Sequence, residues 1–130
     1  MKKTSRRRAA AKPPRRSRCP VACTLDVLGD RWTLLVVRDL IRGKRRFAEL
    51  VESPERIPTN ILTERLKRLV GLGVVKSQRY SDHPPRVEYQ LTAKGEDLRP
   101  VLHAMVEWGI THAGGRIPPP LPPRPDTEKS

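Results

Sequence analysis

The sequence is poor in aromatic residues, in cysteine and in long apolar runs. Among its 130 residues are five aromatic residues and two cysteines. So few aromatic rings leave little surface for stacking bases, which argues against a protein that binds single-stranded RNA. Two cysteines do not indicate a disulfide scaffold. No apolar run reaches the ~18 residues of a membrane helix, and the basic N-terminus lacks the hydrophobic segment of a secretory signal, so we expect a cytoplasmic protein.

The residue clusters of an enzyme are also missing. The three histidines, His83, His103 and His112, are scattered along the chain. We find neither a phosphate-binding glycine loop nor a zinc-type Cys/His spacing. Cys19 and Cys23 could be combined with two of the histidines into a metal site, but that spacing matches no established ligand pattern. We therefore expect no enzymatic activity, no metal and no cofactor.

What the sequence has in excess is positive charge, and most of it lies at the ends. The formal net charge is +13, yet residues 19–115 hold 15 Lys and Arg against 12 Asp and Glu, a net +3. Residues 1–18 are basic and residues 116–130 are rich in proline, so neither can bury enough apolar surface to offset its ordering entropy. We predict two disordered tails around one domain, 19–115. The charge suggests a polyanion partner such as nucleic acid, with the specificity supplied by the domain.

Hydrophobic periodicity predicts a mainly α fold with a small β-hairpin (α+β). Apolar residues recur at three- and four-residue spacing in four segments, and two runs alternate like strands. A turn formed by Asp82-His83-Pro84-Pro85 joins these runs, because adjacent prolines cannot extend a sheet ladder. The expected elements are helices over 24–43, 45–53, 58–70 and 93–113, with strands over 74–80 and 86–92.

The third helical segment has two distinct faces. Leucines and a valine share one face (Leu62, Leu66, Leu69 and Val70), and polar residues occupy the other (Asn60, Thr63, Glu64, Lys67 and Arg68). A short helix, a tight turn and an amphipathic helix followed by a hairpin is the order of a winged helix-turn-helix. In that arrangement one helix enters a DNA groove ~12 Å wide, its neighbour braces it, and the hairpin is the wing.

Several separate stretches resemble one family. "CPV", "LDVLGDRWTLLVVRDLIRGKRRFAEL", "ILTERLKRL", "GVV", "HPPRVEYQLTAKGEDLRPVL" and "WG" are similar, in order and spacing, to the HxlR-type winged helix-turn-helix regulators of bacteria and archaea. The resemblance runs from Cys19 to about Trp108. It implies a homodimer, joined through the first and last helices, that binds an operator in double-stranded DNA and controls nearby transcription. Two-fold symmetry then predicts an inverted-repeat operator.

The resemblance also assigns roles to segments of the helix-turn-helix. It makes the helix from Pro58 to about Val70 the recognition helix, places Arg46 and Phe47 in the bracing helix and makes "PPRVEYQLT" the wing. Many relatives open the recognition helix with a small polar residue, whereas Pro58 has no side-chain oxygen to cap it. Thr59 is the candidate cap in its place.

The candidate DNA contacts divide into two groups. Asn and Lys pair with adenine and guanine edges, so the candidate base contacts are Thr59, Asn60, Thr63, Glu64 and Lys67. Glu64 could accept from cytosine or only pair with Arg68. The candidate phosphate and wing contacts are Arg45, Arg46, Arg65, Arg68, His83 and Arg86. The alternatives are a merely solvated polar face, and a bracing role for Arg46 or Arg65 through Glu49 or a neighbouring acid.

The two cysteines suggest a second possibility, a thiol-based sensor of the same fold. Cys19 and Cys23 lie four residues apart at the start of a helix, near Arg16 and Arg18, and such surroundings favour a thiolate. In some relatives the cysteine of the "CP" position senses electrophiles or oxidants, and Cys19 matches that position. Cys23 could resolve a sulfenic acid. The alternative is a pair of small packed apolar side chains.

Two further questions stay open at this point. Trp32 and Trp108 are expected to anchor the core or the subunit interface, and a pocket for a small-molecule effector could lie between their helices. A non-specific nucleic-acid-binding protein remains an alternative to the sequence-specific regulator.

Overall fold

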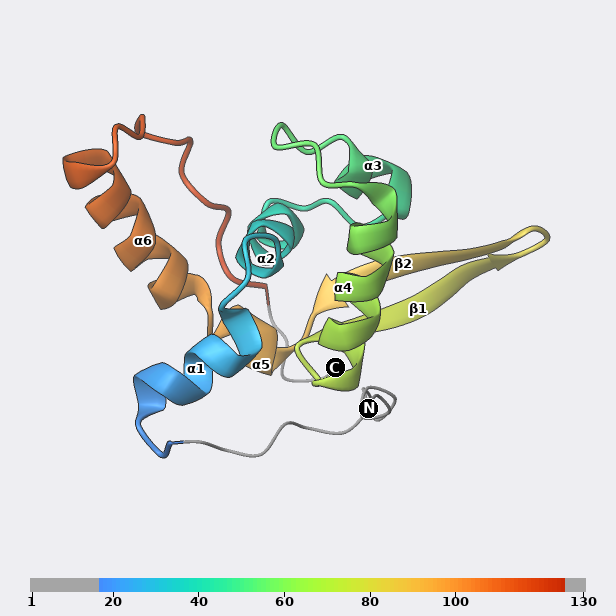
Figure 1. Cartoon of the computed structure of the whole chain (residues 1–130). Helices are drawn as coiled ribbons and strands as arrows, with labels where there is room; N and C mark the ends of the chain where they lie inside the picture. The colour runs from blue at the N-terminus through green and yellow to red at the C-terminus, as the bar shows by residue number, and fades with distance from the viewer. Residues whose placement is uncertain (1–16, 126–130) are drawn as a thin grey trace. The chain divides into compact units, whose positions relative to one another are not determined.

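The computed structural model describes residues 17–125 (Figure 1). The chain divides after Asp30 into two units, and the first contributes a single helix. Predictions for residues 1–16 and 126–130 lie outside the described part. Between residues 17 and 125, no helix is both long and apolar enough to cross a membrane. The elements are α1 (Pro20–Leu28), α2 (Thr33–Ile41), α3 (Phe47–Val51), α4 (Thr59–Gly71), β1 (Val75–Asp82), β2 (Pro85–Leu91), α5 (Ala93–Glu96) and α6 (Arg99–His112).

Two of the predicted helices are each divided, which corrects the sequence analysis. The segment 24–43 breaks at Gly29, the C-cap of α1, whose backbone lies so near Leu25 that a Cβ would fall 2.4 Å from the carbonyl oxygen. The segment 93–113 breaks before Arg99, and Pro100 then stands in the first turn of α6. Proline has no N–H to continue a preceding helix, but it fits a first turn, where that donor is unused.

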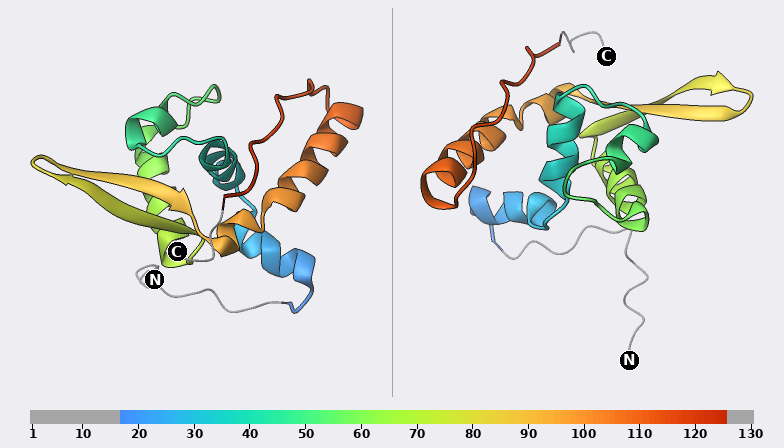
Figure 2. Two further views of the ribbon diagram at one scale, coloured as in Figure 1. Left: turned by 180° about the vertical axis from the view of Figure 1, so that it is seen from behind. Right: turned by 90° about the horizontal axis from the view of Figure 1, so that it is seen from above.

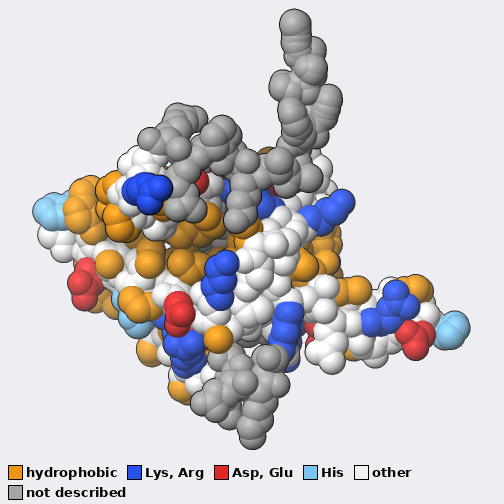
Figure 3. Space-filling view, turned by 90° about the horizontal axis from the view of Figure 1, so that it is seen from below, with side chains coloured by type: hydrophobic (Ala, Val, Ile, Leu, Met, Phe, Trp, Pro, Cys, Tyr) orange, Lys and Arg blue, Asp and Glu red, His pale blue; other side chains and the backbone are white. Residues whose placement is uncertain are grey.

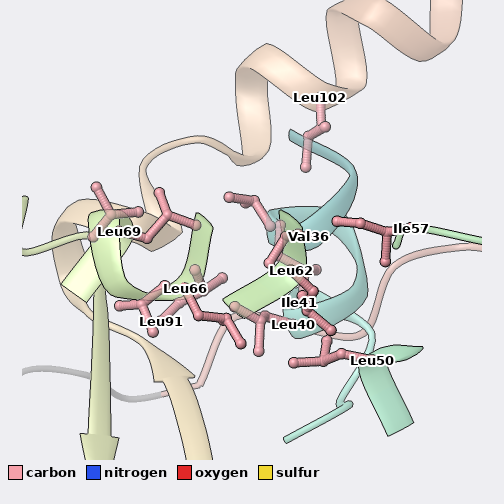
Figure 4. Packing of buried hydrophobic residues seen from close by; sticks show 13 residues of the cluster. Val36, Leu40, Ile41, Leu50, Ile57, Leu62, Leu66, Leu69, Leu91 and Leu102 are labelled. Carbon is pink, nitrogen blue, oxygen red and sulfur yellow. The ribbon is translucent and has the colours of Figure 1, made fainter. Parts of the chain in front are cut away.

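The core of the second unit is built on the leucine face of α4. Leu62, Leu66 and Leu69 are buried as predicted, whereas Val70 is only partly buried. They pack with residues of α2, α3 and the base of the hairpin, such as Val36, Leu50 and Leu91 (Figure 4). Burying each such side chain is worth roughly 1.5–3 kcal/mol. This packing fixes which side of α4 remains outside.

Both α2 and α4 end in the same glycine motif. After α4, the N–H of Gly73 donates to the carbonyl of Val70 and that of Val74 to Leu69, each at 3.0 Å. Gly73 has a φ of 76°, in the left-handed region that favours glycine. Gly43 repeats the arrangement after α2 with a φ of 103°. These two stops place the turn to α3 and the start of β1.

The hairpin is longer than predicted and its turn is shorter. The antiparallel register runs from Val75↔Leu91 to Asp82↔Pro85, with an irregularity between Arg79 and Ser81. The turn therefore consists of His83 and Pro84 alone, and the four-residue turn predicted from the sequence is wrong. Pro85 is accommodated because it is the first residue of β2, where a missing N–H is tolerated.

The proline-rich segment after α6 runs back beside the domain between α6 and α2 (Figures 1 and 2). Its described part has no regular secondary structure, but Leu121 packs against the core cluster. Arg99 donates from Nη1 to the Pro122 carbonyl at 2.6 Å, and Arg124 pairs with Asp97 at 3.3 Å. The sequence led us to expect a disordered tail from residue 116 onward. The described part of this segment instead contacts the domain, and its partners are residues distant in the sequence. We call residues 115–124 the strap.

A partly buried ionic cluster joins α2 to the segment between α3 and α4. Arg38 of α2 donates to both carboxylate oxygens of Glu55, at 2.8 and 2.7 Å, and also to Asp39 and Ser53. Because the guanidinium donates these bonds, the pKa of Glu55 falls to about 2. As the pH falls through about 4.5, Glu55 begins to take up a proton in the unfolded chain, whereas in the folded protein it stays ionised until the pH approaches 2.

We expect Glu55→Gln to lower the free energy of unfolding at pH 7 by about 1–2 kcal/mol, a modest loss because solvent partly screens the pair. The folded-state pKa is lowered, so this stabilisation is present above pH ~4.5 and is lost as the pH falls towards 2. Urea unfolding of both proteins between pH 7 and 2.5 measures the difference. Glu52→Gln, an exposed carboxylate with the same charge change, is the control. A difference between wild type and Glu55→Gln that stays constant with pH would contradict the assignment.

Candidate nucleic-acid interface

The polar face of α4 is open to solvent in the described chain. Thr59, Asn60, Thr63, Glu64 and Lys67 are all exposed. They lie opposite the leucines that anchor the helix in the core. Within residues 17–125, the side chains of Asn60 and Lys67 make no hydrogen bond or ion pair. Both are therefore available to an external partner, as a base contact requires.

The start of α4 differs from the expected cap. Pro58 is the N-cap residue and provides no side-chain hydrogen bond, and no hydrogen bond of the Thr59 hydroxyl to the described chain takes its place. Thr59 is thus available at the end of the helix. The Thr63 hydroxyl donates to the Thr59 carbonyl at 2.9 Å. Its proton is used, so Thr63 can only accept a hydrogen bond from a base or a water molecule.

Two arginines of α4 are less available than the sequence suggested. Arg65 pairs with Glu64, its neighbour in the sequence, rather than leaving Glu64 to Arg68. Both Arg65 and Arg68 are partly buried and have further partners. Part of the charge of Glu64 is therefore neutralised within the helix.

Arg46 joins the bracing helix to the wing. Its guanidinium lies 4.2 Å from the centre of the Tyr80 ring and 3.4 Å from the Glu88 carboxylate. The two backbones are also joined at this point. Arg46 and Glu88 form an isolated antiparallel β-bridge, and the Tyr89 N–H donates to the Arg45 carbonyl at 2.7 Å. The bracing alternative considered for Arg46 is thus present, but its acid is Glu88. No local pattern reveals a pair 42 residues apart.

Glu49 caps the start of α3. Its carboxylate accepts from the N–H groups of Arg45 and Arg46 at 2.8 and 3.0 Å. These two bonds lower the pKa of Glu49 below its ordinary value. The carboxylate therefore stays charged and caps the bracing helix. The sequence offered Glu49 as one possible partner of an arginine side chain, whereas in the structure it accepts from the backbone N–H groups of two arginines.

The wing carries exposed charges at its outer end. Histidine, basic and acidic side chains gather there, as Figure 3 shows. His83 and Arg86 are exposed, and so is Arg45 at the base of the hairpin. Arg79, which sequence analysis did not single out, pairs with Asp82 at 3.5 Å. Arg45 and Arg86 make no side-chain interaction within the described chain.

The first unit presents Cys19 at the start of α1. Cys19 is exposed and is the N-cap residue of the helix. Hydrogen bonds from the backbone N–H groups of Ala22 and Val21 lower the pKa of its thiol. The sequence predicted a lowered pKa in part from nearby arginines, but the helix start is the cause that the structure gives. Cys23 is partly buried, and its thiol donates to the Ser17 carbonyl at 3.4 Å.

Among residues 17–125, no three His, Cys, Asp or Glu are placed to hold a metal ion. Residues 27–115 match the model of the HxlR-like helix-turn-helix family. The chain belongs to this family. The resemblance predicted from the sequence is confirmed, and with it the winged helix-turn-helix fold. As a member of the HxlR-like family, the protein is a transcriptional regulator whose partner is DNA, and it is not an enzyme.

Relatives of this HxlR-like protein include redox regulators. The chain is 41% identical to the uncharacterized HTH-type transcriptional regulator sll1512 of Synechocystis sp. over 91 residues, which are 70% of this chain and 67% of that protein. The redox regulator HypR in its reduced form is 38% identical, with a TM-score of 0.67 over 72% of this chain and 93% of that one. The reduced form of the regulator YodB from B. subtilis is 33% identical, with a TM-score of 0.63 over 77% and 100%.

Proposed function

We propose that this protein is a homodimeric regulator that reads an inverted-repeat operator with α4 and follows the adjacent DNA with its wing. The observation that carries the proposal is the division of α4 into a buried leucine face and an exposed polar face. Asn60 and Lys67 are unpaired on the exposed face. Their chemistry suits adenine and guanine edges in the major groove.

The remaining contacts divide by their chemistry. Thr59 and Thr63 lie beside Asn60, and Thr63 can accept from an exocyclic amino group of adenine or cytosine. Arg45, Arg86 and His83 are exposed cations or titratable groups suited to phosphates. Arg46 acts indirectly, because it holds the wing to α3 through Tyr80 and Glu88. Arg65 and Arg68 complete the basic side of α4, where Arg65 and Glu64 form a pair.

The second copy is proposed to cover the apolar faces of the first and last helices. On α6, Met105 and Trp108 are 52% and 64% exposed, and on α1, Val21 and Leu25 are exposed to a similar degree. Exposed apolar side chains gathered on helices mark interaction surfaces. Two-fold symmetry would separate the half-site centres by about 34–36 Å or a multiple of it. The dimer would thus fix the spacing that a single α4 cannot read.

Asn60→Ala is expected to weaken operator binding by about 1–3 kcal/mol while leaving non-specific binding unchanged. Arg86→Ala should weaken both and reduce the salt slope by about one, because it removes a phosphate contact. Fluorescence anisotropy on the protein's own footprinted operator and on random duplex, over a range of salt concentrations, measures both quantities. If Asn60→Ala lost equal affinity for operator and random DNA, the exposed face of α4 would not be the reading face.

Trp108→Ser is expected to shift the protein from dimer to monomer at micromolar concentration, because it removes the most exposed large ring of α6 from the interface. Sedimentation velocity measures the change, and circular dichroism checks that the helices persist. The control is Glu107→Gln, which alters the neighbouring exposed position on α6 without removing an apolar side chain. A variant that remains dimeric would place the subunit interface elsewhere.

A second function is supported by Cys19, namely regulation of DNA binding by oxidants. The thiol is exposed, its pKa is lowered, and solved relatives include redox regulators in reduced form. YodB has also been solved after treatment with diamide. Diamide takes two electrons and two protons from two thiols, leaving one disulfide and a hydrazine. We propose that Cys19 is the first thiolate to react and that the second thiol is Cys23 or a thiol across the dimer.

Diamide is expected to release the wild-type protein from its operator, and Cys19→Ser is expected to abolish this release. Reduced Cys19→Ser should bind the operator as the wild type does, because the residue lies outside the proposed DNA contacts. Gel shift with and without diamide measures the response, and Cys23→Ser reports whether the second thiol is in the same chain. Release of Cys19→Ser by diamide at the wild-type concentration would refute the proposal.

A further inference from the structure

A cavity of about 750 Å³ lies between α2, α6 and the strap. Its size is within the range of small-molecule sites in proteins. Its lining contains none of the residues proposed to contact DNA, and it contains neither Met105 nor Trp108. The cavity is therefore distinct from both surfaces described above.

The strap is fastened on both sides of the cavity. At its start, the Gly115 N–H donates to the Gly109 carbonyl at 3.0 Å. At its far end, Leu121 packs on the core, and Pro122 accepts from Arg99. Arg99 is itself held by the buried carboxylate of Glu96 at 2.6 Å. The span between these fastenings holds three successive prolines, so it is stiff and has few backbone donors to satisfy.

One wall of the cavity is apolar. Leu102, Val106 and Ile110 contribute it from successive turns of α6. Ile117, which is 81% exposed, and Leu121 line the same cavity from the strap, together with Pro118, Pro119 and Pro120. Such a wall fits an aliphatic chain or an aromatic ring.

The other wall is positively charged. Arg38, Arg42 and Lys44 line it, Arg116 of the strap adds a further cation to the lining, and the one carboxylate there belongs to Asp39. Asp39 is engaged by Arg38, which also binds Glu55. Arg42 and Lys44 make no side-chain interaction within residues 17–125. Two cations beside an apolar wall complement a molecule with a hydrophobic body and an anionic head.

We propose that this cavity binds an amphipathic organic anion, a medium-chain or aromatic carboxylate, with the carboxylate at Arg42 and Lys44 and the apolar body beneath the strap. The site does not depend on the proposed DNA contacts, because they share no residue. Its failure and theirs can be separated by measuring ligand binding without DNA.

Isothermal titration calorimetry of the full-length protein with octanoate tests the headgroup. We expect a Kd on the order of 10–100 μM, with 1-octanol and octylammonium binding at least tenfold more weakly. The double variant Arg42→Gln/Lys44→Gln should weaken octanoate at least tenfold and leave 1-octanol unchanged. Lys76→Gln/Arg79→Gln, which removes the same charge from β1, should bind octanoate as the wild type does. Equal binding of the three probes, or an equal effect of the two double variants, would overturn the proposal.

Methyl NMR of the wild-type protein tests the location. Octanoate should shift the methyl signals of Ile110 and Ile117, which line the cavity, and leave that of Ile61 on α4 in place. Leu121→Ser, which loosens the strap, should weaken octanoate and 1-octanol alike. Shifts at Ile61 without shifts at Ile110 and Ile117 would show that octanoate binds elsewhere. Absence of binding at millimolar octanoate would show that the cavity takes no such ligand.

Discussion

The packing of the α4 leucines into the core is the constraint on which the rest depends. Leu62, Leu66 and Leu69 are almost completely buried, so the helix cannot rotate without exposing them. Because the three leucines share one face, a rotation would expose them together, and the combined cost, roughly 1.5–3 kcal/mol for each, exceeds the ~1–3 kcal/mol of a single base contact. The packing therefore fixes the orientation of Asn60 and Lys67 in the protein without DNA. The core supplies the preorganisation that a reading helix needs.

The short stretch between α2 and α3 connects three surfaces. Arg42 and Lys44 face the cavity, while Arg45 is exposed at the base of the wing and Arg46 holds that wing. Gly43 makes it possible for neighbouring residues to reach different surfaces, because its left-handed conformation ends α2 and turns the chain within one residue. Alternate residues can then point in different directions. Lys44, which lines the cavity, is thus the immediate neighbour of Arg45, whose carbonyl accepts the N–H of Tyr89 in the wing.

The hydrophobic periodicity of the sequence predicted the features that depend on a single helix or strand, and it missed the contacts that join two separate elements. The faces of α4 and the wing followed from spacing alone, because burial of a leucine face and strand alternation are local patterns. The breaks at Gly29 and before Arg99 were missed, since apolar spacing continues across both. The contacts of Arg46 with Glu88 and of Arg99 with Pro122 join residues far apart in the sequence. Only the folded chain brings such partners together, so composition indicated a disordered tail where Leu121 packs on the core.

The arrangement of α6 suggests why one helix would serve both assembly and ligand binding. Leu102, Val106 and Ile110 recur every four residues and form the cavity wall, while Met105 and Trp108 lie on the adjoining side and are proposed to meet the second copy. A rigid helix couples its neighbouring faces, because a shift that suits one face moves the other. Occupation of the cavity would therefore bear on the angle between subunits. In the proposed dimer, that angle would set the distance between the two α4 helices, and a fixed half-site spacing would make operator affinity sensitive to it.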